Sequence, residues 1–195
     1  YAEARRDLRF WLLLLSVMII TGCCASVVQQ LASYVSDIGY SYEVSAMVSS
    51  CSLGLMAVGK LLTGRMYDKL GVRTSTLICM ACVIGGIGIL SMAASGVAFI
   101  GVFLVLFGVG CALTTVAYPI LTTALFGNRD YSSIYGIVNV ANSVGTAVGS
   151  PIAAAIFDSQ GSYVPAWYLA AALLCVDFVV LLVMFRKKPA AEAVH

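Results

Sequence analysis

Two groups of polar or ionisable side chains lie within long apolar stretches of the sequence. Asn139, Asn142 and Ser143 are spaced i, i+3 and i+4, so one face of a helix would present all three. These side chains can hydrogen-bond a solute, or they can bond a neighbouring helix for about 1 kcal/mol or less each. Asp177 is an acid at a depth where an ionised carboxylate must find a partner or take up a proton. Proton coupling and a bond to a neighbouring helix are therefore both open interpretations of Asp177.

Enzymatic chemistry has little support in the same stretches. An intramembrane hydrolase needs a base, a nucleophile and an orienting group close together, yet the apolar stretches contain no histidine and no H-E-x-x-H or G-x-S-x-G motif. The seven cysteines lie in apolar runs, and the pair Cys79 and Cys82 lacks a second pair to complete a metal site. A net charge of +2 leaves too little basic surface for nucleic acid. We therefore expect no enzyme, no metal, no cofactor and no nucleic-acid partner.

The elements that carry these residues are long apolar segments. Hydrophobic residues make up 61% of the 195 residues and charged residues only 10%, whereas a soluble domain is about half apolar and a quarter charged. A membrane crossing needs about 20 apolar residues, and the backbone at that depth must be paired within a helix. The sequence therefore predicts an all-α membrane protein, a transmembrane bundle over residues 10–185 with six helices at about 10–35, 44–64, 75–94, 97–125, 132–157 and 164–185.

The charged residues predict which ends of the helices face the cytoplasm. Lys60 and Asp177 alone lie within the predicted spans, and the stem of Lys60 is long enough to reach the headgroups. Lys and Arg gather in alternate connections, whereas the opposite connections carry acidic residues only. By the positive-inside bias the segments 1–9 and 186–195 are cytoplasmic, in a plasma membrane or a bacterial inner membrane. The basic residues concerned are Arg5, Arg6, Arg9, Arg65, Lys69, Arg73, Arg129, Arg186, Lys187 and Lys188.

An internal repeat relates the two parts of the predicted bundle. A shift of 90 residues aligns Ala57–Gly59 with Ala147–Gly149 and Met66–Asp68 with Ile156–Asp158. The two copies would run in opposite directions through the membrane, as in the 3+3 inverted repeat of many secondary transporters. Chance similarity between two glycine-rich helix ends is the alternative explanation.

The segment after the second predicted span, residues 64–73, reads G-R-M-Y-D-K-L-G-V-R. Gly64 would let a neighbouring helix approach closely, and Gly71 can supply a left-handed turn. Asp68 is placed where it can face a helix N-terminus. A merely positive connection would explain the charges but not the spacing of the glycines. Three basic residues at headgroup level can pair with Asp68 or with anionic lipid, namely Arg65, Lys69 and Arg73.

This pattern, G-x-x-x-D-K-x-G-x-R, resembles the cytoplasmic-loop signature of the major facilitator superfamily, whose common form is G-x-x-x-D-R-x-G-R-R. Lys69 and Val72 depart from that form, and such loosening is typical of the copy in the second half of these transporters. The stretches Pro119–Gly136 and Phe157–Tyr163 look like the branch that contains monocarboxylate transporters and oxalate/formate antiporters. The resemblance implies the C-terminal six-helix half of such a protein, and the polar opening at Tyr1 indicates a piece of a longer chain.

The resemblance also implies a set of site residues. In this fold the first, second, fourth and fifth helices of each half line a central cavity, so polar residues of those spans are candidates to bind solute. The middles of the second and fifth spans contain no Lys or Arg, which makes a doubly charged anion doubtful and leaves a monocarboxylate or neutral solute open. The candidates are Gln29, Gln30, Ser52, Thr115, Tyr118, Asn139, Asn142 and Ser143.

The function implied by the resemblance is secondary active transport. The chain would form the C-terminal half of a carrier that moves a small solute, such as a monocarboxylate or other organic anion, by alternating access. The expected partners are the lipid bilayer, the N-terminal six-helix half of the same protein and the solute. The alternative is a six-helix membrane channel or scaffold that acts as a homodimer.

Overall fold

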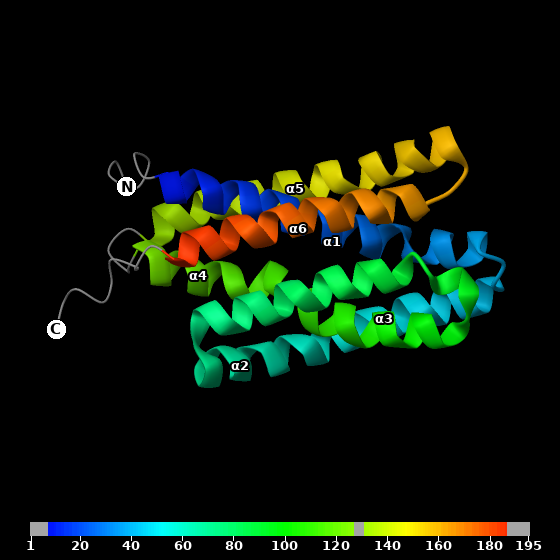
Figure 1. Cartoon of the computed structure of the whole chain (residues 1–195), viewed down its shortest axis with the longest axis horizontal. Coiled ribbons are helices and arrows are strands. Elements are labelled where there is room, and N and C mark those ends of the chain that lie inside the picture. The colour runs from blue at the N-terminus through cyan, green and yellow to red at the C-terminus, as the bar shows by residue number, and fades with distance from the viewer. Residues whose placement is uncertain (1–7, 127–130, 187–195) are drawn as a thin grey trace.

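The computed structural model describes residues 8–126 and 131–186, and the regular structure there is helical throughout. The segments 1–7, 127–130 and 187–195, and with them Arg5, Arg6, Arg129, Lys187 and Lys188, lie outside the described residues. Figure 1 shows the helices side by side in one elongated bundle. They are α1 (Leu8–Asp37), α2 (Tyr42–Leu90), the short 3-10 turn η2 (Ala93–Ser95), α3 (Val97–Gly110), the π-helical turn η3 (Leu113–Ala117), α4 (Tyr118–Phe126), α5 (Tyr131–Gln160) and α6 (Val164–Arg186).

Five of the described helical runs are long and apolar enough to cross a membrane, and α2 is one of them. At 49 residues α2 is a hairpin, because the backbone reverses at Gly71. Its arms, 42–70 and 72–90, correspond to the second and third predicted spans, so the bundle contains the six expected segments. The predicted connection at 65–74 is itself helical except at Gly71. The second arm ends at Leu90 rather than near residue 94, since η2 follows it.

The start of α1, the reversal at Gly71 and the end of α6 all lie at one end of the bundle (Figure 1). Lys69 and Arg73 flank that reversal, and Arg9 lies in the first turn of α1. Asp37 and Asp158 lie at the opposite end of α1 and α5, respectively. Apart from Lys60 within α2, the described Lys and Arg gather at the end that holds Gly71, together with Asp68, as the positive-inside bias predicts for one side of a membrane.

The internal repeat is visible as a pair of equivalent helix contacts. Where α5 packs on α1, a Cβ atom built at Gly145 would lie 2.6 Å from the carbonyl oxygen of Met18. By the shift of 90 residues, Gly145 corresponds to Leu55 and Met18 corresponds to Gly108. These two residues are also in contact: a Cβ built at Gly108 would lie 2.9 Å from the Cβ of Leu55. Chance similarity of sequence would not reproduce a contact between helices. The contacts are consistent with the predicted 3+3 inverted repeat.

The two glycines that the repeat aligns, Gly59 and Gly149, occupy crossing points of the same kind. A Cβ at Gly59 would collide with the carbonyl oxygen of Gly108, and a Cβ at Gly149 would collide with that of Gly22. At both points two helix backbones touch without an intervening side chain. Small residues allow this approach, which supplies the van der Waals contact that holds helices together in lipid.

An aromatic cluster holds the end of the bundle opposite the Gly71 reversal. The ring of Tyr34 meets Trp167 edge to face with centroids 5.6 Å apart, and Tyr163 stacks on Phe157 and Trp167 at 4.3 and 5.8 Å. The Tyr34 hydroxyl donates a 2.8 Å hydrogen bond to the carbonyl of Leu90, the last residue of α2. Aromatic pairs contribute about 0.5–1.5 kcal/mol beyond the area they bury. The cluster thus ties α1, α2, α5 and α6 together.

Tyr34→Phe is expected to lower the free energy of unfolding by about 1 kcal/mol, because the ring stays while the Leu90 carbonyl loses its buried donor. The measurement is thermal unfolding of the purified full-length protein in detergent. Tyr168→Phe is the matched control, since Tyr168 is 60% exposed on the neighbouring helix. Equal unfolding temperatures for the two variants would show that the Tyr34 hydroxyl does not help hold α2.

Candidate functional site

Three helices meet at a hydrogen-bonded cluster near the middle of the bundle, which we call the central cluster: Thr21 of α1, Tyr118 of α4 and Asn142 of α5. The Thr21 hydroxyl donates to Oδ1 of Asn142 at 2.9 Å. Because Thr21 has one hydroxyl proton, Tyr118 is the donor in the 2.8 Å bond between their hydroxyls. The Val17 carbonyl lies 3.4 Å from the Tyr118 hydroxyl as a second acceptor. The cluster fixes α4 and α5 against α1.

Gln30 forms a second connection between helices. Its Nε2 donates to Oγ of Ser150 in α5 at 3.2 Å, and its Oε1 accepts a 3.2 Å bond from the hydroxyl of Tyr163, just before α6. Both ends of the Gln30 amide are therefore engaged within this chain. Its neighbour Gln29 is exposed.

The three side chains of the predicted polar stripe on α5 point in two different directions. Asn142 turns towards α1 and the central cluster, while Asn139 and Ser143 are exposed. The Ser143 hydroxyl donates to the backbone carbonyl of Asn139 at 3.0 Å. Successive helical residues are about 100° apart around the axis, so Asn142 can turn towards α1 while Ser143 beside it stays exposed. The spacing placed all three residues on one side of α5 but could not show this division.

The sequence-predicted candidates therefore fall into three environments. Some have exposed side chains, those in the two hydrogen-bonded clusters position helices, and one is buried without a hydrogen-bond partner in the part of the chain that the structure describes. Thr21, Ser150 and Tyr163 were not predicted, because a single hydroxyl in an apolar helix has no spacing signal. The exposed candidates are Gln29, Thr115, Asn139 and Ser143; the clustered ones are Gln30, Tyr118 and Asn142; and Ser52 is 3% exposed, with no hydrogen-bond partner for its hydroxyl among the described residues.

The fourth predicted span is interrupted where its polar residues lie. The carbonyl of Ala112 accepts from the backbone N–H of both Thr115, at 3.2 Å, and Val116, at 2.9 Å, as the chain enters the π-turn η3. Pro119 follows at once and has no N–H to continue the ladder. Single π-turns inside α-helices often occur at functional sites. This one leaves Thr115 exposed while Tyr118 reaches the central cluster.

The glycine of the signature segment adopts the expected positive φ. Gly71 has φ 76° and ψ 166°, a combination open essentially to glycine alone. Two hydrogen bonds of 2.8 Å close the turn, one between the hydroxyls of Tyr67 and Thr76 and one from the Ser75 hydroxyl to the carbonyl of Met66. Side-chain hydroxyls, rather than Asp68, therefore join the two arms of α2.

The expected close contact at Gly64 is wrong for the helices of this chain. No described atom outside the local backbone lies within 4 Å of a Cβ built there. The close approach of the first arm of α2 falls at Gly59 instead, because that glycine faces α3. The charged members of the segment, Arg65, Asp68, Lys69 and Arg73, are exposed and form no ion pair within the described part of the chain.

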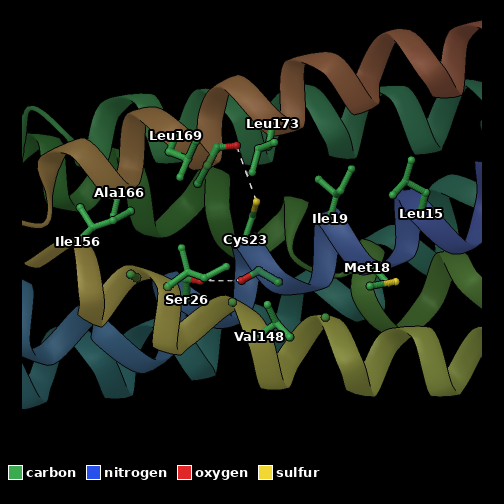
Figure 2. A pocket seen from close by; sticks show the side chains of 16 residues that line it. Leu15, Met18, Ile19, Cys23, Ser26, Val148, Ile156, Ala166, Leu169 and Leu173 are labelled. Atoms are coloured by element: carbon green, nitrogen blue, oxygen red, sulfur yellow. Dashed lines mark hydrogen bonds between the residues drawn. The ribbon is translucent and has the colours of Figure 1, made fainter.

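An apolar groove runs between α1, α5 and α6, with a cavity volume of about 220 Å³. Figure 2 shows that side chains from all three helices line it. Its two polar side chains are already occupied: the Ser26 hydroxyl donates to the Gly22 carbonyl at 2.7 Å, and the Cys23 thiol faces the Ala170 carbonyl at 3.8 Å. Because no polar group remains to orient a solute, we exclude the groove as the candidate site. Its labelled apolar residues are Leu15, Met18, Ile19, Val148, Ile156, Ala166, Leu169 and Leu173.

The profile of the Major Facilitator Superfamily matches residues 10–195. The chain belongs to the major facilitator superfamily. This membership agrees with the signature at residues 64–73, whose glycine-dependent reversal is present, and with the inverted repeat of helix contacts. The chain is accordingly a membrane protein.

Curated relatives and a solved structure agree with this membership. Human monocarboxylate transporter 12 is 23% identical over 175 residues, which cover 88% of this chain and 34% of that protein. Its rat counterpart is also 23% identical over 175 residues, covering 88% and 36%, respectively. The chain thus spans about a third of the length of these relatives. The structure of the Escherichia coli fucose:proton symporter superposes with a TM-score of 0.70 and 15% identity, covering 94% of this chain and 44% of that one, which shows the fold.

Asp177 lies in the interior of the helix bundle. Its side chain is 1% exposed, and neither carboxyl oxygen has a hydrogen-bond partner among the described residues. Ser16 of α1 is nevertheless its polar neighbour, so a bond to that helix and proton coupling both stay predictions for Asp177.

Proposed function

We propose that this chain is the C-terminal six-helix half of a secondary active transporter and moves a small solute by alternating access with an N-terminal half as its partner. The observation that carries the proposal is the set of exposed polar side chains on helices that meet at the central cluster. Polar groups at membrane depth are costly against lipid, so they face protein or a water-filled path. Gln29, Thr115, Asn139 and Ser143 are such groups.

The position of the central cluster supports a solute site near the middle of the bilayer. Thr21 lies close to the midpoint of α1, and Tyr118 follows the π-turn that interrupts the fourth span. Carriers with inverted repeats place their sites at this depth, at discontinuous helices. Asn142 offers a donor there, because its Oδ1 is used by Thr21 while its Nδ2 has no partner among the described residues and its side chain is half-buried.

We propose a monocarboxylate or another organic anion as the solute, transported across a plasma membrane or a bacterial inner membrane. The side-chain amide N–H groups of Gln29, Asn139 and Asn142 are suitable donors for one carboxylate. The similarity to monocarboxylate transporter 12 supports the same class. The described candidates include no Lys or Arg, so the balancing cation would come from the N-terminal half.

The test is uptake by the full-length protein in proteoliposomes against a panel of carboxylates, amino acids and sugars, with and without an imposed pH gradient. We expect saturable uptake of a monocarboxylate that competes with other monocarboxylates and not with sugars. Ion conductance without saturable uptake, from this chain alone as a dimer, would favour the six-helix channel instead.

Asn142→Leu is expected to weaken solute binding about tenfold, a loss of about 1.4 kcal/mol, because it removes one donor and the acceptor of Thr21. Folded protein should still form, since Thr21 and Tyr118 remain bonded to each other. The half-saturation concentration of uptake measures the effect. Thr146→Val on the same helix is the control, because the Thr146 hydroxyl only bonds the backbone of Asn142, at 3.0 Å. Unchanged uptake would remove Asn142 from the site.

A further inference from the structure

A row of exposed residues runs along α5 beside the solute site that we propose. Asn139, Ser143, Ala147 and Pro151 follow one another at a spacing of four residues, and all four are exposed. Residues four apart lie on the same face of a helix, one above the other. Ala147 lies near the middle of α5, so the row reaches the centre of the crossing helix. The polar atoms of this row therefore face either lipid or the transport path.

Pro151 leaves one backbone carbonyl of this row without its helical partner. In an α-helix the carbonyl of Ala147 accepts a bond from the N–H of residue 151, but proline has no N–H to donate. Elsewhere in α5, hydroxyls donate to carbonyls, as Thr146 does to Asn142 at 3.0 Å. No side chain in residues 8–126 or 131–186 donates to the Ala147 carbonyl. This carbonyl, which carries only a methyl side chain beside it, therefore keeps its capacity to accept.

Ser143 provides a second acceptor one turn away. Its single hydroxyl proton is used in the 3.0 Å bond to the carbonyl of Asn139, so its oxygen can only accept from a further partner. Two neighbouring acceptors repel a carboxylate and suit a group that carries O–H or N–H donors. Polar backbone atoms are costly against hydrocarbon, so at this depth we expect the Ala147 carbonyl to face protein or a water-filled path.

We propose that the Ser143 hydroxyl oxygen and the Ala147 carbonyl bind a hydrogen-bond donor of the solute, so that the carrier prefers monocarboxylates with a hydroxyl or amino group over unsubstituted ones. The proposal rests on the proposed function, because it specifies the solute class of the same site. The carboxylate binds side-chain amides such as that of Asn139, and the hydroxyl or amino group turns to the two acceptors. Pro151 is a positioning residue that keeps the carbonyl free.

Uptake of three matched carboxylates by the full-length protein in proteoliposomes tests this preference: propionate, 3-hydroxypropionate and 3-aminopropionate. We expect the hydroxyl or the amino compound to have a half-saturation concentration about tenfold lower than that of propionate. Pro151→Ala restores an N–H for the Ala147 carbonyl and should remove most of this ratio. Pro165→Ala is the matched control and should keep the ratio, because Pro165 lies in the first turn of α6 and Gly161, four residues earlier, precedes that helix.

The ratio separates the loss of an acceptor from a change in helix shape, which would alter the uptake of all three compounds alike. Equal half-saturation concentrations in the unmodified protein, or an unchanged ratio in Pro151→Ala, overturn the proposal. If Pro151→Ala yields no folded protein, Ser143→Ala replaces it and should reduce the same ratio; an unchanged ratio there has the same consequence. If the unmodified protein takes up no carboxylate at all, the proposed function itself is contradicted, a result distinct from uptake without preference.

Discussion

Gly149→Ala is expected to destabilise the folded bundle by about 3 kcal/mol, at the upper end of the range for overpacked sites. The added methyl group would occupy the position of the Gly22 carbonyl oxygen, and both atoms belong to helix backbones that no rotamer change can move. The helices α1 and α5 must separate to admit it. Their separation would also weaken the Gly145 contact with Met18 and the bond between Thr21 and Asn142.

The measurement is the unfolding temperature and the monodisperse yield of the full-length protein after size-exclusion chromatography. Gly136→Ala is the control on the same helix, because no described atom beyond the local backbone lies within 4 Å of its Cβ and alanine favours helix by about 1 kcal/mol over glycine. Gly59→Ala should behave like Gly149→Ala, since a Cβ at Gly59 would likewise collide with a backbone carbonyl oxygen, that of Gly108. If Gly149→Ala and Gly136→Ala were equally stable, the close crossing of α1 and α5 would be wrong.

Gly71→Ala is expected to cost about 2 kcal/mol, because alanine at φ 76° and ψ 166° brings its Cβ against the backbone. The two arms of α2 could then meet only by opening the turn that the Tyr67–Thr76 bond closes. Proteolysis at residues 64–73 of the full-length protein, together with thermal unfolding, measures this opening.

Gly88→Ala provides the comparison for Gly71→Ala. Gly88 belongs to the second arm of α2, and a Cβ there meets no described atom within 4 Å apart from the local backbone. We expect Gly88→Ala to unfold at or above the temperature of the unmodified protein, since it gains helix propensity. A Gly71→Ala protein as stable and as protease-resistant as Gly88→Ala would mean that the reversal does not need glycine.

The architecture could largely be predicted from the sequence, because a chain that crosses lipid can adopt few backbone structures. Apolar length and the segregation of charge located the helices, and the superfamily signature and the aligned glycines at positions 59 and 149 indicated the inverted repeat. The two arms of α2 and a turn at Gly71 were predicted, but the helical conformation of the connection was not, since the polar composition of residues 65–74 suggested a loop. The residues there are nevertheless helical on both sides of Gly71.

The candidate site was less accessible, because it depends on which side of each helix faces which neighbour. Asn142 and Ser143 are adjacent in sequence and in the same stripe, yet one contacts α1 and the other is exposed. Thr21 joins both partners of the central cluster, but a lone threonine in an apolar helix gives no periodic signal. The π-turn at Leu113–Ala117 likewise has no recognisable motif in the sequence, although Pro119 lies two residues after it.

The proposed function presupposes that these helices cross a bilayer with the Gly71 reversal on its cytoplasmic side. Single cysteines introduced into the full-length protein, after replacement of its native cysteines, including the seven of this chain, test this most directly. With a membrane-impermeant maleimide on intact cells, Tyr42→Cys should be labelled, and Lys69→Cys should be labelled only after the membrane is permeabilised. Labelling of Lys69→Cys in intact cells, or release of the protein from membranes without detergent, would contradict the account.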